Sequence, residues 1–115
     1  MIRANEDDLE GEPYGPVFYE GQRFTGEAVD ELPDGTLVSS TSYVNGLQDG
    51  PDREWYNDGS RRAEGMFRQG VPVGVHRTWD PDGHVVREIE FSDGGRILRR
   101  RGFDAAGNVT WEDAG

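Results

Sequence analysis

The stretch Val44–Phe91 reads VNGLQDGPDREWYNDGSRRAEGMF over residues 44–67 and RQGVPVGVHRTWDPDGHVVREIEF over residues 68–91. Placed one above the other, the two segments share their landmark residues. The aligned pairs are Gly46 and Gly70, Gly50 and Gly74, Trp55 and Trp79, Gly59 and Gly83, and Phe67 and Phe91. A fixed period of about 24 residues is typical of repeat architectures, in which each unit buries its apolar side chains against its neighbours.

The repeat continues on both sides of this stretch, so the sequence predicts four copies, at approximately residues 17–43, 44–67, 68–91 and 92–115. The first copy is divergent, because Glu31 stands where later copies have an aromatic residue. In the fourth copy, Leu98 replaces the second glycine. Terminal repeats are commonly atypical because they cap the stack, so we expect the end units to be the least regular.

Residues 1–16 precede the repeats as an acidic N-terminal arm without periodicity. Two interpretations of this arm stay open. It is either a solvated or loosely attached tail, or an arm that docks on a partner or on the arginines near residue 100.

Each copy is predicted to form one β-hairpin. A turn of the form (Pro/Asn/Ala)-(Asp/Ala)-Gly occupies residues 33–35, 57–59, 81–83 and 105–107. Its first residue makes the corner, and its glycine accepts the left-handed conformation that closes a three-residue loop with a bulge. The turn predicts that Trp79 faces Val85, Arg77 faces Arg87 and Val75 faces Ile89.

Because side chains alternate between the two faces of a strand, this register sorts residues by face. The predicted apolar face carries Trp55, Phe67, Val75, Trp79, Val85, Ile89, Phe91, Phe103, Val109 and Trp111. The predicted polar face brings Glu54 near Arg62, His76 near Glu88, and Asp80 near His84. The predicted fold class is all-β: an elongated single-layer antiparallel sheet of four tandem hairpins, with about eight short strands over roughly 40 Å.

The landmark positions are predicted to be structural. The Gly-x-x-x-Gly pairs make the link to the next hairpin, where a positive φ costs other residues more. The predicted structural set is Gly46, Gly50, Trp55, Gly59, Phe67, Gly70, Gly74, Trp79, Gly83, Phe91, Gly94, Phe103 and Gly107.

Charge and composition limit the classes of partner. The chain carries 23 acids against 12 basic residues, a net charge of −11. This balance disfavours nucleic acid and anionic membranes as partners and suits a basic protein surface. The arginines of segment 96–101 are expected either to anchor acids within the chain or to form a contact surface. No cysteine, apolar leader or long apolar run is present, so we expect a cytoplasmic protein without a membrane span.

Two segments resemble a known family. The units at 57–70 (NDGSRRAEGMFRQG) and 44–56 (VNGLQDGPDREWY) are similar to the MORN-repeat variant of the YwqK-type antitoxin family, whose unit runs approximately NGxLxxEGxYxNGxxxGxWxxYxxNG. The matching positions are Gly59, Glu64, Gly65, Phe67, Gly70, Gly74 and Trp79, with Asp82 and Gly83 for the closing pair. The resemblance covers about residues 18–111, and Glu31, Arg61 and Leu98 depart from it. It implies MORN-like hairpin repeats that act as a binding module and neutralise a cognate toxin by contact.

Few residues suggest catalysis or metal binding. The two histidines, His76 and His84, could act as proton-transfer groups with Asp80 and Glu88, or bind a metal with Asp82 as a further ligand. Turn chemistry accounts for the aspartates, and mixed clusters on an exposed sheet are usually solvated. We therefore predict no metal site and no cofactor.

The sequence thus favours a non-enzymatic protein–protein interaction module, an antitoxin or immunity protein that masks a basic toxin or enzyme. Charge complementarity would speed association, and exposed aromatic residues would anchor the partner. The predicted partner-binding residues are Asp7, Asp8, Glu10, Tyr14, Tyr19, Glu54 and Tyr56. Two alternatives stay open: a small enzyme or accessory subunit of a biosynthetic pathway with a groove around His76 and His84, and a self-associating scaffold. We expect a monomer or a weak edge-to-edge dimer.

Overall fold

The computed structural model describes residues 2–12 and 15–114. Most of these residues lie in β-strands, and one short 3-10 helix, η1 (Glu6–Asp8), occurs among them. The all-β prediction is therefore confirmed. The strands are β1 (Ile2–Asn5), β2 (Glu10–Gly11), β3 (Val17–Tyr19), β4 (Gln22–Arg23), β5 (Gly26–Glu31), β6 (Leu37–Val44), β7 (Leu47–Trp55), β8 (Arg61–Arg68), β9 (Val71–Trp79), β10 (Val85–Phe91), β11 (Ile97–Phe103) and β12 (Val109–Asp113).

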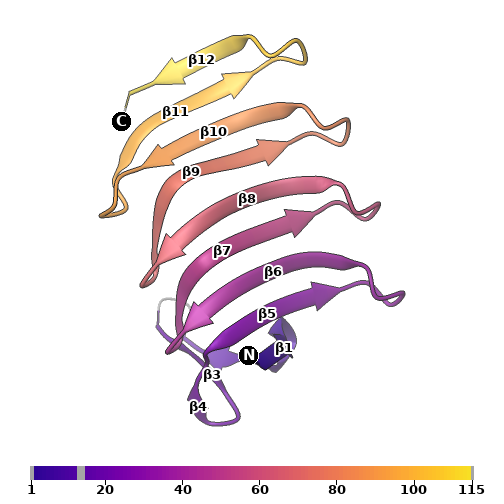
Figure 1. Cartoon of the computed structure of the whole chain (residues 1–115), viewed down its shortest axis with the longest axis vertical. Helices are drawn as coiled ribbons and strands as arrows, with labels where there is room; N and C mark the ends of the chain where they lie inside the picture. Colours follow the sequence, from indigo (N-terminus) through magenta and orange to yellow (C-terminus); the bar gives the residue numbers. More distant parts are fainter. Residues whose placement is uncertain (1, 13–14, 115) are drawn as a thin grey trace.

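The main sheet has nine strands in the order β1-β5-β6-β7-β8-β9-β10-β11-β12. From β5 to β12 the spatial order follows the chain, so four antiparallel hairpins lie in a row (Figure 1). The molecule measures 47 × 37 × 21 Å along its principal axes. The predicted elongated, open stack of four hairpins is confirmed.

The N-terminal arm differs from the loosely attached tail that composition suggested. Strand β1 pairs in parallel with β5, which places Ala4 beside Ala28 and buries both. The edge of β5 offers backbone hydrogen-bonding groups that β1 satisfies. This contact lies at the opposite end of the sheet from β11, so the alternative in which the arm docks on the arginines near residue 100 is wrong (Figure 1).

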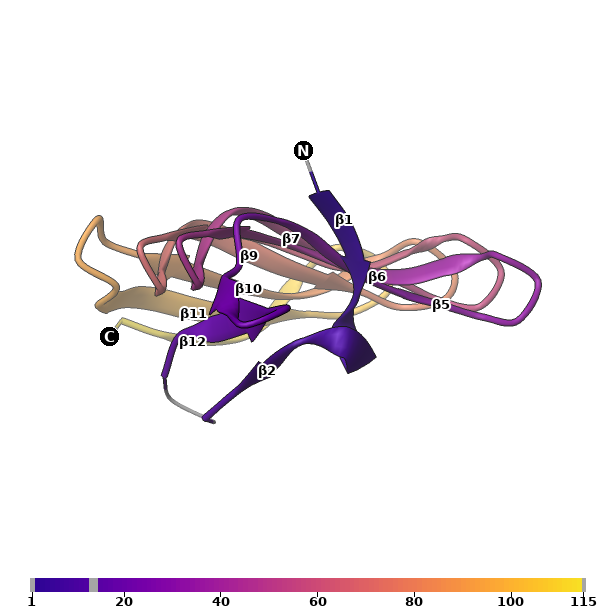
Figure 2. The same ribbon diagram turned by 90° about the horizontal axis from the view of Figure 1, so that it is seen from below.

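A small sheet in the order β2-β3-β4 lies to one side of the main sheet (Figure 2). The core of the N-terminal end forms where the two sheets meet. Phe24 is 1% exposed there and packs with Ala4 and Ala28. The rings of Tyr19 and Tyr43 lie 5.8 and 5.7 Å from that of Phe24. Single-layer geometry therefore holds for the C-terminal hairpins, whereas the first hairpin is covered on one face.

The four predicted turns form as expected. In the turn after β7, the N–H of Tyr56 donates to the carbonyl of Ser60 at 2.8 Å, and the N–H of Gly59 donates to the carbonyl of Tyr56 at 2.9 Å. The same pair of hydrogen bonds closes the other three turns. The four turn glycines, Gly35, Gly59, Gly83 and Gly107, have φ values of 90°, 88°, 90° and 87°.

Between hairpins the chain reverses in two residues. Asn45 and Gly46 have φ values of 52° and 86°, and Gln69 and Gly70 have 49° and 88°. Positive φ at both central residues is typical of a type I′ turn, which matches the twist of the flanking strands. The last link differs, because Gly95 rather than the predicted Gly94 has a positive φ, of 84°.

A β-bulge beside each three-residue turn changes the predicted register. Trp79 faces Val85 as expected, but the pairing then shifts by one residue on β10. The observed pairs are Arg77 with Glu88, His76 with Ile89, and Val75 with Glu90, so the predicted pairs Arg77 with Arg87 and Val75 with Ile89 are wrong. A one-residue shift moves every later side chain to the other face.

The predicted single apolar face is therefore also wrong, because its residues divide between two faces. We call face A the face that the small sheet covers at one end, and face B the opposite one. The pairing places Phe67, Ile89, Phe91 and Trp111 on face A, together with Tyr43 and His76. It places Trp55, Val75, Trp79, Val85, Phe103 and Val109 on face B.

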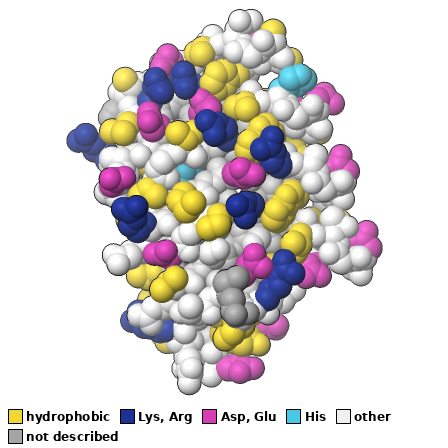
Figure 3. All heavy atoms as spheres, in the orientation of Figure 1, with side chains coloured by type: hydrophobic (Ala, Val, Ile, Leu, Met, Phe, Trp, Pro, Cys, Tyr) yellow, Lys and Arg dark blue, Asp and Glu magenta, His cyan; other side chains and the backbone are white. Residues whose placement is uncertain are grey.

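Face B carries a row of alternating charges across six strands. Figure 3 shows basic and acidic side chains interspersed over the face in view. We call this row the charge ladder: Arg53, Glu64, Arg77, Glu88, Arg101 and Glu112, each paired in register with the next. Opposite charges directly across a strand pair stabilise by about 0.2–1 kcal/mol. The ladder therefore favours the observed register over slipped ones.

Candidate binding surface

Acidic side chains gather at the N-terminal end of face A. There η1 lies over the main sheet, and the Glu6 carboxylate accepts a hydrogen bond from the Ser39 hydroxyl at 3.4 Å. Asp30 and Glu54 flank Ser39 in the register. Burial raises the pKa of Glu6, and the charges of Asp30, Asp7 and Glu54 raise it further against the lowering hydrogen bond from Ser39. We call Glu6, Asp7, Asp30, Asp52 and Glu54 the acidic patch.

Basic residues do not neutralise this patch. Across β5, β6 and β7 the sequence has a single arginine, Arg53, and the pairing places it on face B. Within residues 2–12 and 15–114, no acid of the patch forms an ion pair. The arginines of β11 instead contact acids of β10 and β12: Arg99 with Glu90 and Glu112, Arg100 with Asp113, and Arg101 with Glu88. Arg99, Arg100 and Arg101 of segment 96–101 therefore anchor acids within the sheet.

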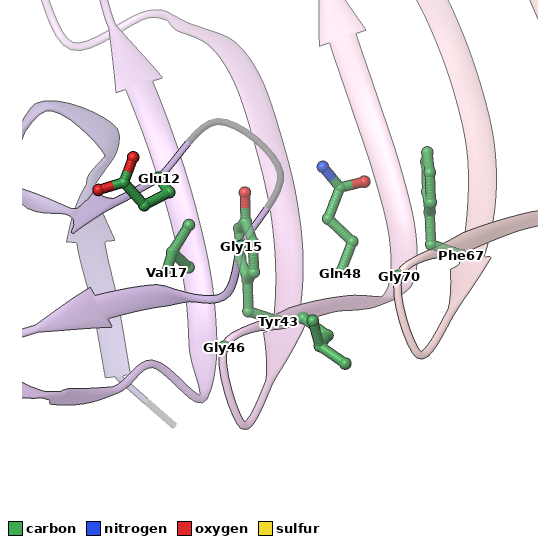
Figure 4. A pocket seen from close by; sticks show the side chains of 9 residues that line it. Glu12, Gly15, Val17, Tyr43, Gly46, Gln48, Phe67 and Gly70 are labelled. Atoms are coloured by element: carbon green, nitrogen blue, oxygen red, sulfur yellow. The ribbon is translucent and has the colours of Figure 1, made fainter.

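Beside the patch, face A is hollowed between the small sheet and strands β6 to β8 (Figure 4). The hollow has a volume of about 360 Å³, and the side chains of Tyr43, Gln48 and Phe67 stand in a row along it. Burial raises the pKa of Tyr43, a hydrogen bond with Gln48 lowers it, and the charges of Asp52 and Glu6 raise it. The Oε1 atom of Gln48 is buried without a hydrogen-bond partner. The hollow is thus lined by two aromatic rings, lies close to negative charges, and contains one hydrogen-bond acceptor without a partner.

The predicted partner-binding residues fall into two groups. Asp7, Asp8 and Glu10 are exposed, and Glu54 lies in the acidic patch close enough to act on Glu6. Tyr19 and Tyr56 are half-buried rather than exposed: Tyr19 packs on Phe24, and the Tyr56 hydroxyl donates to the carbonyl of Trp79 at 2.7 Å. Their role in partner binding stays a prediction. Tyr14 lies outside the described residues. Glu54 also faces Ala63 rather than the predicted Arg62, because Arg62 falls in a bulge.

His76 has a packing role on face A. Its ring lies between Phe67 and Phe91, at centroid distances of 5.4 and 4.8 Å. Its Nε2 atom lies 3.0 Å from the carbonyl oxygen of Met66. The ring covers Gly65 so closely that a Cβ atom on Gly65 would overlap it.

The alternative catalytic residues converge only in part: His84 and Glu88 line one hollow of about 440 Å³, whereas His76 lies apart from them. His76 lies on face A, whereas Glu88 lies on face B with Arg77 and Arg101, so the predicted pair of His76 and Glu88 is wrong. The predicted contact of His84 with Asp80 forms, with Nδ1 to Oδ2 at 3.3 Å. These residues lie at a turn, away from the ring of His76.

The cluster Asp80, Asp82 and His84 could offer three ligand atoms within 4.8 Å of one another. However, Asp80 already accepts the backbone N–H groups of Asp82 and His84, at 3.0 and 2.9 Å. The backbone hydrogen bond from His84 is the largest cause that lowers the pKa of Asp80. Asp104 closes the next turn in the same way. Turn closure therefore explains the cluster.

The sequence prediction missed Gln48, Asp52, Glu6 and Asp30 as site residues. A signal for two of them exists in the repeat, since Gln48 aligns with Phe24 of the preceding copy, and Asp52 aligns with His76 of the following copy. At each of these two positions, an amide or a carboxylate side chain stands where the other copy has a ring.

Comparisons with known proteins leave the family open. No family model and no curated protein matches this chain. Among solved structures, it is similar to part of S. aureus TarM in complex with fondaparinux, α-GlcNAc-glycerol and UDP, with a TM-score of 0.49, 13% identity and coverage of 92% of this chain and 19% of that one. A second TarM structure gives a TM-score of 0.45 and 13% identity, over 93% of this chain and 20% of that one. The chain thus spans about a fifth of their length. Among the described residues, no helix is long and apolar enough to cross a membrane.

Proposed function

We propose that this chain is a non-enzymatic binding module that holds a basic protein partner on the N-terminal end of face A. The observation that carries the proposal is the separation of charge. The acidic patch lacks ion-pair partners among the described residues, whereas the arginines of β11 are paired at the far end of the sheet. An uncompensated acidic surface attracts a basic partner and speeds its association.

The resemblance of the repeat units to the YwqK-type antitoxin family supports a narrower version. In this version the partner is a toxin or enzyme whose activity the contact masks. A cytoplasmic location and a monomer or weak dimer remain predictions. The enzyme alternative requires His76 and His84 in one groove, but His76 lies on face A, whereas His84 lines a hollow with Glu88 of face B.

The test has two stages. The chain is first used to capture proteins from its native host, and the captured protein is then purified and its affinity measured by calorimetry at rising salt. We expect a basic partner whose affinity falls as salt rises, because exposed charges are screened. The variant D30N/E54Q should weaken binding.

The matched control is D82N/D93N, which changes the net charge equally at exposed turns away from the patch. This control should leave affinity nearly unchanged. Capture of an acidic partner, or equal affinity for D30N/E54Q and the wild type, would refute the proposal. For the narrower version, co-expression should relieve the partner's toxicity in the host cell.

A further inference from the structure

We propose that the hollow between the turns of the third and fourth hairpins binds the side chain of a tyrosine from a protein partner. Val85 and Phe103 of face B line this hollow, at the edge of the sheet that carries the three-residue turns (Figure 1). The acidic patch lies on face A at the N-terminal end, so the site goes beyond the proposed function.

We call this space the turn hollow. Its volume of about 440 Å³ is within the range of pockets that bind organic groups. The start of β10 lies on one side of it, and the end of β11 with turn 105–107 lies on the other. Its apolar lining includes Val85, Phe103, Ala105 and Ala106, and its polar lining includes Glu88 and Arg101. Apolar walls beside polar groups suit a ring that carries a polar atom.

The corresponding space between the second and third hairpins is filled by the chain itself. Tyr56 reaches from its own turn to the next hairpin, where its hydroxyl donates to the carbonyl of Trp79 at 2.7 Å. The guanidinium carbon of Arg61 lies 4.4 Å from the centre of the Trp79 ring. With these neighbours, Trp79 is only 6% exposed. A tyrosine side chain is thus a group that this fold already places between two neighbouring turns.

All three of these residues are replaced by smaller ones in the next repeat. The replacements are Asp80 for Tyr56, Val85 for Arg61, and Phe103 for Trp79. Asp80 does not cross to the fourth hairpin, because its carboxylate accepts the N–H groups of Asp82 and His84 in its own turn. The ring of His84 does not close the space either, since its Nδ1 atom lies 3.3 Å from Asp80 and the side chain is 45% exposed. The turn hollow is the volume that these replacements leave open.

The missing group is a ring rather than a second cation. Arg101 already lies over Phe103, with its guanidinium carbon 5.6 Å from the ring centre, and it donates to Glu88 at 2.9 Å. Arg101 therefore has the role on Phe103 that Arg61 has on Trp79. A further aromatic ring would pack against Phe103 and Val85 without bringing a second positive charge beside Arg101.

A hydroxyl group on this ring would find an acceptor. The carbonyl of Phe103 is the equivalent of the Trp79 carbonyl that accepts from Tyr56. Among the described residues, no side chain donates to the Phe103 carbonyl. A phenolic O–H is such a donor, and tyrosine is among the residues that most often anchor protein contacts. These features together favour the tyrosine side chain of a partner as the occupant.

The test uses N-acetyl-tyrosine-amide as the probe, and binding to the isotope-labelled full chain is followed by NMR. We expect saturable shifts at Val85, Phe103 and Ala106, with a dissociation constant on the order of 10 mM. The phenylalanine analogue should bind about two- to tenfold more weakly, because one neutral hydrogen bond is lost. Equal binding of the two analogues, or no shift at the highest soluble concentration, would overturn the proposal.

Two variants restore the residues of the preceding hairpin and should close the hollow. D80Y introduces the equivalent of Tyr56, and V85R introduces that of Arg61, so both residues are ones that the repeat accommodates at these positions. Each should weaken binding of the probe at least about tenfold while the amide spectrum stays folded. The matched control is D80N, which removes the same charge without adding a ring and should bind the probe normally. Unchanged binding by D80Y and V85R, or an equal loss in D80N, would contradict the proposal.

A last comparison distinguishes a partner's tyrosine from a free phenol. p-Cresol carries the same ring and hydroxyl without a peptide backbone. If p-cresol binds in the turn hollow and N-acetyl-tyrosine-amide does not, the site takes a free phenol and the proposal is wrong. Because Asp30 and Glu54 lie on the other face, binding of a basic partner there can fail or succeed independently of this result.

Discussion

Gly65→Ala tests whether the ring of His76 is locked in place. An added methyl group would overlap the imidazole of His76. The imidazole cannot move along the sheet, because Phe67 and Phe91 hold it at 5.4 and 4.8 Å. The backbone of Gly65 does not have a positive φ, so the cost is steric rather than conformational. Overpacking of this kind costs about 1–3 kcal/mol.

The expected cost can be measured by urea unfolding and by calorimetry. A loss of about 2 kcal/mol would lower the melting temperature by about 8 °C in a chain of this size. The double variant G65A/H76A gives the decisive comparison, because the methyl group then enters space vacated by the ring. We expect the methyl group to cost at least about 1 kcal/mol less in the H76A background than in the wild type.

Gly94→Ala is the matched control, since Gly94 also lacks a positive φ and its Cβ would make only an ordinary contact, at 3.9 Å from the Ser92 hydroxyl oxygen. This substitution should be neutral or should stabilise by about 0.4–1 kcal/mol through the unfolded state. If G65A proves as harmless as G94A, or as costly in the H76A background as in the wild type, the account of His76 fails.

Three further predictions concern stability. Glu88→Gln should cost about 1–3 kcal/mol, because the 15%-exposed carboxylate accepts hydrogen bonds from two arginines. Burial alone would raise the pKa of Glu88, but the two arginines lower it overall. The contribution of Glu88 to folding stability is therefore full above the pKa of the unfolded chain and is lost as pH falls through the pKa of the folded chain. Equal acid unfolding curves for E88Q and the wild type would contradict this. Gly46→Ala should cost more than Gly59→Ala. Their φ values are alike, at 86° and 88°, but only at position 46 would the added Cβ atom overlap Pro16 and Val17; equal urea midpoints for the two variants would contradict this. Tyr56→Phe should cost about 0.5–1.5 kcal/mol through the lost hydrogen bond to Trp79, and an unchanged midpoint would count against that bond.

Turns were predictable because their chemistry is local. Pro81, Asp82 and Gly83 specify a three-residue loop through the φ preferences of proline and glycine alone. The same holds for Asn45-Gly46, where two residues favour positive φ. With turns fixed at a regular spacing, the number and order of hairpins follow.

The faces were not predictable, because each turn is followed by a bulge. The bulge after Val85 shifts later pairs by one residue, and alternation then assigns Ile89 to the opposite face. The charge ladder was visible in the sequence as two sets at equivalent repeat positions, Arg53, Arg77 and Arg101, and Glu64, Glu88 and Glu112. That the two sets form one ladder could be recognised only from the strand register, since the pairing brings the arginines beside the glutamates.

Local sequence chemistry specifies an all-β stack of four hairpins, because a repeated turn needs only its own residues to form. Which distant segments become neighbours depends on the tertiary structure. Parallel pairing of β1 with β5 and the small sheet over Phe24 depend on contacts between distant segments, which no local pattern specifies. The hollow on face A likewise exists only because Tyr43, Gln48 and Phe67 lie on adjacent strands.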